Sequence, residues 1–264
     1  MMGITQFDGK RGDGHVQRFV HSKWRKTEAI KVNPVVREHI PDTRQLGRAT
    51  LQSMLSEYGM VYVKPDKGTF GKGVIRVEQD GAGFKFQSGT TIRTFASYEG
   101  LYDGLKQLTG KRLYLVQKGI HLLKHGGRRF DLRVMVQKSP AGRWESTAMV
   151  GRVAYPGKIV TNYHSGGTLK SVPALLQAHM GPVELTAFTG GLKRLGVSVA
   201  KQLETAYPGI KEIGIDIAVD RSHKSWILEV NTCPDPYIFR ILKDKEIFRR
   251  VIRYAKAYGR IKSR

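Results

Sequence analysis

Two acidic residues lie in neighbouring strand-like segments of this sequence, separated by a short polar turn. The segments are residues 212–220 and 225–231, and the turn is residues 221–224. If the turn closes a symmetric hairpin with Val219 opposite Trp226, Asp216 lies directly opposite Glu229. Asn231 then projects from the same face as Glu229, because side chains alternate along a strand. Two carboxylates and one amide oxygen therefore converge on one place.

Facing carboxylates repel each other unless a cation lies between them. Ligands that are all oxygens favour a hard ion, and Mg²⁺ with nucleotide phosphates is the usual occupant. The alternative is two unrelated acids, one of them paired with a nearby Lys or Arg. Asp216 interrupts an isoleucine-rich strand, where an unpaired charge is costly, and this favours an ion site. We therefore predict that Asp216, Glu229 and Asn231 bind Mg²⁺, with Mn²⁺ as an alternative ion.

A glycine-rich loop between two other strand-like segments is the second candidate site. Residues 64–74 read KPDKGTFGKGV. Glycines let backbone N–H groups approach an anion closely, and successive N–H groups can cradle phosphates. Lys64 and the lysines of the loop add positive charge. The loop lacks the GK[ST] signature of a Walker loop and a strand-like segment follows it, so a charged hairpin turn is the alternative.

Charged residues also lie inside strand-like segments between these two sites. Asp131 and Arg133 alternate with apolar residues in one segment, and Arg152 lies in the next. An arginine on a strand face is a good clamp for a phosphate or a carboxylate. Taken singly, each of these residues is explained as well by an exposed strand face or an internal salt bridge.

The elements that must position these residues follow from hydrophobic periodicity. We expect a helix after a cap at Asp42 or Thr43, because residues 51, 54, 55 and 58 form one apolar stripe. Strands and helices alternate without a regular βαβ order, which indicates an α+β fold. The expected strands are residues 61–64, 74–77, 84–86, 113–117, 130–137, 144–155, 212–219 and 226–230. The other expected helices are residues 97–108, 172–179, 185–206 and 241–258.

Composition limits the classes of protein that the chain can belong to. With 264 residues, 40% of them hydrophobic, it can form a substantial core. Lys and Arg outnumber Asp and Glu by 45 to 22, so the net charge of +23 attracts polyanions. A single cysteine excludes an internal disulfide, and no apolar run is long enough to span a bilayer or to serve as a secretory signal. We expect a cytoplasmic protein.

Taken in order, these segments resemble the ATP-grasp superfamily, and within it the YheC/YheD-like group of endospore coat-associated proteins. The resemblance runs from about Ser22 to the end of the chain. The residues that carry it are 22–24 (SKW), 40–43 (IPDT), 61–65 (VYVKP), 115–120 (LVQKGI) and 227–232 (ILEVNT).

The resemblance implies an ATP-grasp fold, in which two α+β subdomains clasp ATP. Residues 1–21 would be a loose leader and residues 22–264 the ATP-grasp domain, without the usual complete N-terminal domain. About residues 60–120 would form a small lid subdomain with a glycine flap. About residues 121–264 would form the larger subdomain with the Mg²⁺ site.

The resemblance also assigns roles to individual residues. Lys64 would contact the ATP phosphates, and Arg48 stands where the family has a further lysine. The flap residues would be Gly68, Thr69, Gly71, Lys72 and Gly73. The hinge that meets the adenine edge would be Gln117, Lys118, Gly119 and Ile120. On the substrate side, Arg133 and Arg152 would hold the acyl phosphate or the carboxylate, and Asn162 with the turn at residues 166–167 would shape the pocket.

The chemistry implied is that of a carboxylate–amine ligase. A carboxylate would attack the γ-phosphate, and an amine would capture the resulting acyl phosphate, with release of ADP and phosphate. The substrates are an unidentified carboxylate and amine, for which an acidic polymer or peptide would suit the basic surface. One alternative is a coat-associated structural or binding protein that keeps the fold without turnover. Another is non-specific binding of nucleic acid, for which the sequence has no recognition motif.

Overall fold

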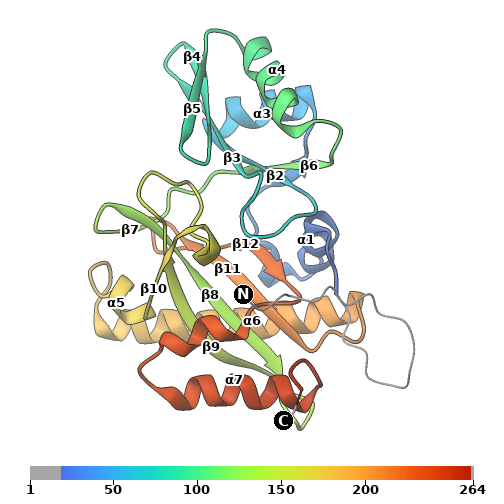
Figure 1. The fold of residues 1–264 in the computed structure, drawn as a ribbon, viewed down its shortest axis with the longest axis vertical. Helices are drawn as coiled ribbons and strands as arrows, with labels where there is room; N and C mark the ends of the chain where they lie inside the picture. The colour runs from blue at the N-terminus through green and yellow to red at the C-terminus, as the bar shows by residue number, and fades with distance from the viewer. Residues whose placement is uncertain (1–18, 263–264) are drawn as a thin grey trace.

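Two antiparallel sheets form the framework of the protein, which is described here by a computed structural model over residues 19–262 (Figure 1). The first sheet has the order β1 (Thr43–Gln45), β6 (Tyr114–Lys118), β2 (Met60–Pro65), β3 (Ile75–Asp80), β4 (Gly83–Ser88) and β5 (Thr91–Phe95). The second has the order β10 (Thr168–Lys170), β9 (Trp144–Val153), β8 (Arg128–Lys138), β11 (Glu212–Val219) and β12 (Ser225–Asn231), with β7 (Lys124–His125) beside β8. The predicted α+β class is confirmed.

The first sheet is covered by α3 (Arg48–Tyr58) and α4 (Tyr98–Thr109). Leu51, Met54 and Leu55 of α3 are fully buried against the sheet, as their helical spacing predicts. The predicted cap of this helix is wrong, because α3 begins after Gly47. Thr43 instead lies in β1, opposite Gln117, and its hydroxyl donates to the Pro41 carbonyl.

The second sheet has helices on both faces. On one face α6 (Pro182–Ala206) and α5 (Val172–Leu176) pack with α1 (Lys23–Lys31) and α2 (Pro34–Arg37) over the largest core cluster. On the other face α7 (Lys245–Ala257) and the 3₁₀ helix η2 (Pro236–Ile241) pack over Met135 and Val150, and Val251 of α7 is buried in this cluster. The helix expected over residues 241–258 begins later than predicted, at Lys245, and Asp244 caps it. The rest of this second face is left open toward the first sheet.

The two sheets divide the chain differently from the expected subdomains. The first sheet with its helices spans residues 43–118, so β1 and α3 pack with the segment of about residues 60–120 that the sequence was expected to use as a lid. Residues 1–18 of the expected leader lie outside the described residues. The backbone N–H of Val20 donates to Thr232 Oγ1 at 2.9 Å, which attaches the chain before α1 to the end of β12.

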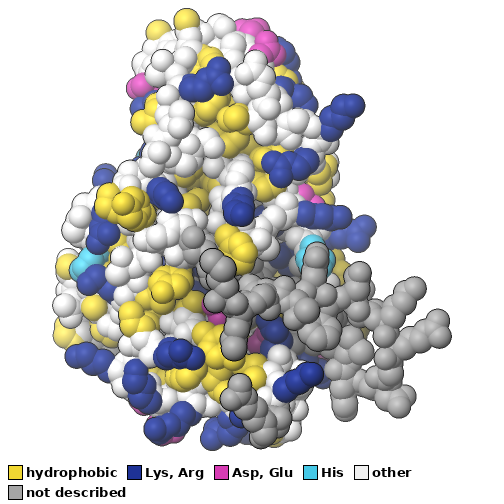
Figure 2. Space-filling view, in the orientation of Figure 1, with side chains coloured by type: hydrophobic (Ala, Val, Ile, Leu, Met, Phe, Trp, Pro, Cys, Tyr) yellow, Lys and Arg dark blue, Asp and Glu magenta, His cyan; other side chains and the backbone are white. Residues whose placement is uncertain are grey.

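Basic side chains are spread over the visible surface of both halves and gather near the lower edge, where α7 lies (Figure 2). This distribution accords with the net charge of +23. No helix within residues 19–262 is long and apolar enough to cross a membrane.

Candidate functional site

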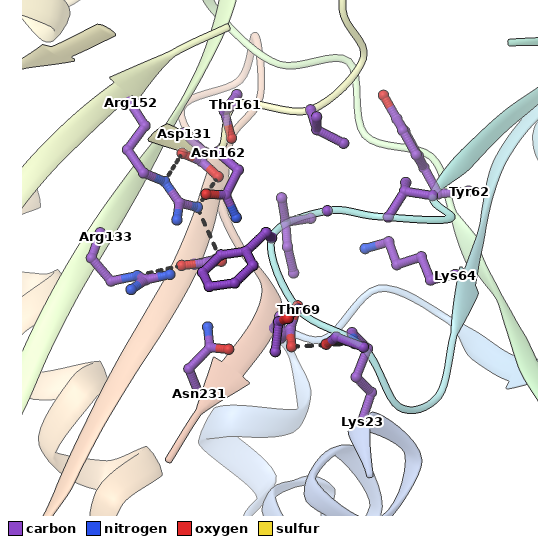
Figure 3. Close-up of a pocket in the computed structure, with 18 of the residues that line it drawn as sticks. Lys23, Tyr62, Lys64, Thr69, Asp131, Arg133, Arg152, Thr161, Asn162 and Asn231 are labelled. Carbon is purple, nitrogen blue, oxygen red and sulfur yellow. Dashed lines mark hydrogen bonds and ion pairs between the residues drawn. The ribbon is translucent and has the colours of Figure 1, made fainter. Parts of the chain in front are cut away.

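A cavity of about 250 Å³ is lined by residues of both sheets and by the loops that join them (Figure 3). Most residues singled out in the sequence line this one cavity. They are Lys64, Gly68, Thr69, Gly71, Lys72, Gln117, Lys118, Ile120, Arg133, Arg152, Asn162, Asp216, Glu229 and Asn231. Arg48, Gly73 and Gly119 do not line it. The tertiary structure thus brings together segments that are up to 167 residues apart, from Lys64 to Asn231.

The flap is the loop between β2 and β3, and it lies close to the loop after β9. Gly71 has φ +70°, and a Cβ there would lie 3.3 Å from Val160 of the opposite loop. The Ser165 hydroxyl donates to the Phe70 carbonyl at 3.1 Å. Gly73, near the end of the flap, has φ +75°, and a Cβ there would meet the Tyr114 hydroxyl at 2.9 Å. Glycine is therefore required at Gly73 for backbone conformation and packing.

Lys64 reaches into the cavity from β2 and is held by a chain of side-chain hydrogen bonds. Its ammonium donates to Gln117 Oε1 at 2.5 Å, and Gln117 Nε2 donates to the Thr43 hydroxyl at 3.0 Å. Burial lowers the pKa of Lys64 to about 8, against the opposing effect of Glu229. An anionic ligand beside Lys64 would raise this pKa again and so favour the fully charged ammonium.

The hinge, residues 117–120, begins in the last two residues of β6 and is held by backbone hydrogen bonds. The N–H groups of Lys118 and Gly119 donate to the carbonyls of Asp42, at 2.8 Å, and Met60, at 2.9 Å. Both N–H groups are thus used in hydrogen bonds within the first sheet and its flanking residues. A contact of the hinge with adenine would use other atoms, such as those of Ile120, which lines the cavity. Gly119 packs so tightly on Met60 that a Cβ would lie 2.6 Å from the Met60 carbonyl oxygen.

Four charged side chains form a buried cluster on the open face of the second sheet (Figure 3). Arg133 Nε donates to Asp216 Oδ1 at 2.5 Å. Arg152 donates to both oxygens of Asp131, at 2.9 and 2.5 Å, and its Nη2 lies 3.0 Å from Asp216 Oδ2. The pairs arise from strand register, since Asp216 lies opposite Arg133 and Asp131 lies opposite Arg152.

This cluster determines the charge state of its members. Burial alone would raise the pKa of Asp216, but Arg133 and Arg152 lower it to about 2. Burial would lower the pKa of Arg152, but Asp131 and Asp216 raise it. Asp216 and Arg152 are therefore both charged at neutral pH.

Asp216 and Glu229 lie opposite each other across β11 and β12, as predicted. Their charges are compensated within the protein itself, Asp216 by the two arginines and Glu229 by Lys23, whose Nζ lies 3.5 Å from Glu229 Oε1. The salt-bridge alternative considered for the sequence is thus realised for both acids.

The same residues still fit a hard cation. Each oxygen of Asp216 accepts one arginine donor, and a carboxylate oxygen has two lone pairs, so one acceptor position remains on each. Glu229 is partly exposed in the cavity, and its contact with Lys23 is long for a charged hydrogen bond. Asn231 follows on the cavity side, where its amide nitrogen is 3.5 Å from the Gly214 carbonyl. Oxygen donors from these three residues suit Mg²⁺ better than a softer metal.

The loop after β9 forms the wall near the arginines. Asn162 and its neighbours Thr161 and Tyr163 line the cavity. Gly166 has φ +87°, and Gly167 donates its N–H to the Asn162 carbonyl at 3.2 Å. A Cβ on Gly167 would collide with the carbonyl oxygens of this loop, so the glycine pair determines the tight turn that presents Asn162.

Arg48 is a predicted site residue that contacts α4 and does not line the cavity. It begins α3, and its guanidinium lies 3.6 Å from Asp103 and 4.7 Å from the centre of the Tyr102 ring on α4. We therefore leave Arg48 out of the candidate site. Lys23, conversely, lines the cavity without having been predicted, although its tripeptide carried part of the family resemblance. The polar sequence of α1 shows little hydrophobic periodicity, and so did not indicate that this helix reaches the site.

The chain is similar to known proteins over most of its length. Residues 14–261 match the YheC/D-like ATP-grasp family. The endospore coat-associated protein YheD of Bacillus subtilis (strain 168) is 25% identical over 225 residues, which are 83% of this chain and 49% of YheD. The chain therefore spans about half the length of this relative.

Two solved structures share the fold. Carboxyaminoimidazole ribonucleotide synthase from Aspergillus clavatus, complexed with ATP, has a TM-score of 0.52 and 14% identity, over 81% of this chain and 45% of that one. D-cycloserine synthetase DcsG has a TM-score of 0.54 and 9% identity, over 90% of this chain and 70% of that one. Family match and fold agree, and the chain belongs to the YheC/D-like family of ATP-grasp proteins.

Proposed function

We propose that the protein binds Mg-ATP in the cavity between its two sheets and uses it to join a carboxylate to an amine. The observation that carries this proposal is the meeting of a glycine flap, Lys64, two arginines and two facing carboxylates in one cavity. Six Lys or Arg and four Asp or Glu residues line it, which suits a polyanionic ligand. Membership of the ATP-grasp family supports the same ligand.

At the nucleotide end of the cavity, the flap and Lys64 bind the phosphates. Gly68, Thr69 and Gly71 line the cavity together with Lys64 and Lys72, and backbone N–H groups of such a loop can cradle phosphates. Ile120 supplies an apolar surface for the adenine ring. The contact of the flap with the loop around Val160 excludes water from the phosphates once the flap is closed.

Asp216, Glu229 and Asn231 would hold Mg²⁺, which when bound neutralises phosphate charge and orients the terminal phosphate. Arg133 and Arg152 lie next to this position. A guanidinium has five N–H donors, so arginines that use one to three of them on Asp131 and Asp216 keep others for an anionic substrate. We assign Arg133, Arg152 and Asn162 to binding of the carboxylate substrate.

The reaction then proceeds in two balanced steps. A carboxylate oxygen attacks the γ-phosphorus, and the bond to the ADP oxygen breaks, which forms an acyl phosphate. The amine nitrogen attacks the acyl carbon, phosphate leaves with its electron pair, and the amine loses a proton. Positioning and charge neutralisation by the cavity residues supply most of the acceleration.

The carboxylate substrate is an acidic polymer or peptide in this proposal, because the basic surface attracts polyanions. We place the protein in the cytoplasm, with an association with the spore coat suggested by the name of its relative YheD.

A second candidate function is binding without turnover, as part of a coat assembly. It is favoured by the buried cluster, in which both arginines already have carboxylate partners and the charges balance without a substrate. Non-specific binding of nucleic acid rests on the net charge alone.

The deciding experiment measures conversion of ATP to ADP against a panel of carboxylates and amines, with Mg²⁺ and then with a chelator. Thermal denaturation with ATP, ADP and a non-hydrolysable analogue is measured in parallel. ADP formation that needs both substrates and Mg²⁺ supports the ligase. Stabilisation by ATP without turnover favours the second candidate, AMP as product contradicts the acyl-phosphate route, and no stabilisation by any nucleotide overturns ATP binding.

A further inference from the structure

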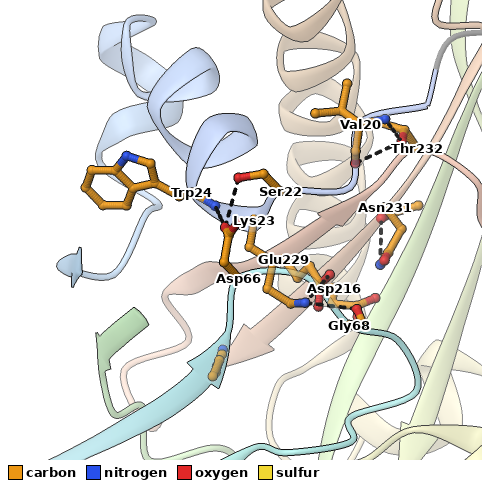
Figure 4. Close-up of polar contacts among 12 residues, drawn as sticks. Val20, Ser22, Lys23, Trp24, Asp66, Gly68, Asp216, Glu229, Asn231 and Thr232 are labelled. Carbon is orange, nitrogen blue, oxygen red and sulfur yellow. Dashed lines mark hydrogen bonds and ion pairs between the residues drawn. The ribbon is translucent and has the colours of Figure 1, made fainter. Parts of the chain in front are cut away.

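The first turn of α1 is bonded to the base of the flap (Figure 4). The buried carboxylate of Asp66, the residue that follows β2, accepts from the Ser22 hydroxyl at 2.9 Å and from the Trp24 N–H at 2.8 Å. The N–H of Lys23 donates to the Asp66 carbonyl at 3.0 Å. A carboxylate at a helix N-terminus is well placed for such bonds, so the flap begins at a rigid anchor.

Lys23 also links the flap to the second sheet. Its ammonium donates to the carbonyl oxygen of Gly68 at 3.0 Å and lies 3.5 Å from Glu229 Oε1 (Figure 4). One nearly buried cation therefore joins a flap residue to a carboxylate of the proposed metal site. No other ion pair of Glu229 occurs within residues 19–262.

The ammonium of Lys23 lies beside Glu229, where a metal ion bound to this carboxylate would also lie. Two more lysines, Lys26 and Lys64, are close enough that Glu229 opposes the lowering of their pKa by burial. A divalent cation on Glu229 would repel Lys23 at short range, because both would share one carboxylate at a place where Lys23 is nearly buried.

We propose that Lys23 is a positioning residue that couples the flap to the metal site. In the metal-free protein it holds Gly68 and occupies the place beside Glu229, and metal binding has to displace it. The inference rests on the proposed Mg-ATP site. Metal occupancy and flap position are then linked, so a change at Lys23 affects both, whereas a purely structural residue affects only the flap.

The test compares four variants by hydrogen exchange of residues 67–73 without metal, and by Mn²⁺ titration followed by electron paramagnetic resonance with a non-hydrolysable ATP analogue. In Lys23→Met, flap exchange should become faster and Mn²⁺ should bind about fivefold more tightly, the lower end of typical coupling effects. Lys23→Arg keeps the charge and the donors and should remain close to wild type in both measurements.

Two matched variants separate the components of this effect. Lys26→Met removes a lysine one turn further along α1, where it does not bond to Gly68, so flap exchange should keep the wild-type rate. Ser22→Ala weakens the anchor at Asp66 without a change of charge, so exchange should become faster while Mn²⁺ affinity stays within about twofold of wild type. Circular dichroism establishes that each variant is folded.

Several results would overturn the proposal. Weaker Mn²⁺ binding in Lys23→Met would assign Lys23 to the phosphates instead. Equal tightening in Lys23→Met and Lys26→Met would show a general effect of charge, and equal tightening in Ser22→Ala would show an effect of flap mobility alone. If wild type binds no Mn²⁺ even with the analogue, the Mg-ATP proposal fails as well, whereas an unchanged Lys23→Met in a protein that binds Mn²⁺ removes this inference alone.

Discussion

Asp216 lies directly opposite Glu229, although the hairpin that carries them is not symmetric. Val219 faces Ser225 and not Trp226, and the register shifts between Asp216 and Ile217. Leu228 is the extra residue of this β-bulge. Because of it, Ile227 packs in the core while Glu229, two residues later, projects into the cavity. Without the bulge, alternation along the strand would turn Glu229 toward the core.

The first prediction concerns the metal. In wild type, Mg-ATP at 100 times its dissociation constant should stabilise the fold by about 2.7 kcal/mol. In Glu229→Gln this stabilisation should largely disappear. The neutral amide keeps the size of the side chain and removes one ligand charge. Thermal denaturation with and without Mg-ATP measures the loss, with the exposed Glu38→Gln as a control that should behave as wild type.

The same variant should melt at a lower temperature without metal. Repulsion between two facing carboxylates would by itself predict a melting temperature no lower than that of wild type, since loss of one carboxylate relieves it. In the structure Asp216 is neutralised by Arg133 and Arg152, and Glu229 is the counter-charge of Lys23. Its removal leaves Lys23 uncompensated in a poorly solvated place. An unchanged or raised melting temperature would contradict this electrostatic account.

The second prediction concerns the buried cluster. Asp131→Asn should lower the free energy of unfolding by about 3 kcal/mol, because Arg152 loses one of its two buried carboxylate partners. Urea denaturation measures the change. Glu246→Gln, which breaks the solvent-exposed pair with Arg249, should change stability by less than about 1 kcal/mol after screening by solvent. Similar losses in both variants would show that burial does not determine the strength of these pairs.

The third prediction follows from the pKa of Lys64, which burial lowers to about 8 from the ordinary value of 10.5. Between these two pH values the unfolded chain binds more protons at this group, so its contribution to stability rises with pH across that window. ATP affinity should move in the opposite direction and fall by about tenfold between pH 7 and pH 10, as the ammonium proposed to contact phosphate is lost.

Fluorescence or calorimetric titration of ATP at several pH values tests this expectation. Lys64→Arg is the control, because a guanidinium stays protonated throughout. Its ATP affinity should vary little over the same range. An equal decline in the variant would place the titrating group elsewhere.

The fourth prediction concerns Gly119. An alanine here would force Met60 and its carbonyl aside, so Gly119→Ala should lower the free energy of unfolding by about 1–3 kcal/mol and weaken ATP binding through the displaced hinge. Gly191→Ala in α6 is the matched control, since a Cβ there meets nothing within 4 Å. It should stabilise the helix by up to about 1 kcal/mol. Denaturation curves and ATP titrations of both variants decide whether the hinge glycine is needed for packing.

Local pattern was sufficient for much of the architecture. The strand at Glu212–Val219 has the predicted bounds, and the apolar stripe of α3 is buried as its spacing requires. Both signals depend on residues within a few positions of one another, where alternation or helical periodicity shows which face is buried. The order of the motifs along the chain was likewise sufficient to indicate the family, which the match over residues 14–261 confirms.

Elements with weak local signals were missed. β5 is an exposed strand at the edge of the first sheet, and α1 buries two lysines and one isoleucine, so neither has the apolar pattern of a buried element. β1 is only three residues long, and its extended conformation depends on pairing with β6, where Thr43 lies opposite Gln117. Tertiary contacts stabilise these segments, and periodicity does not report such contacts.

The sequence by itself determined which residue types are available for a site, namely a glycine loop, strand arginines and hairpin carboxylates. Only the tertiary structure decided their partners. Arg133 is 83 residues from Asp216 in the chain, and Lys23 reaches Glu229 from the opposite end of the sequence. A buried charge requires a counter-charge close in space, whatever the separation along the chain, and strand register with helix packing determines which one it meets.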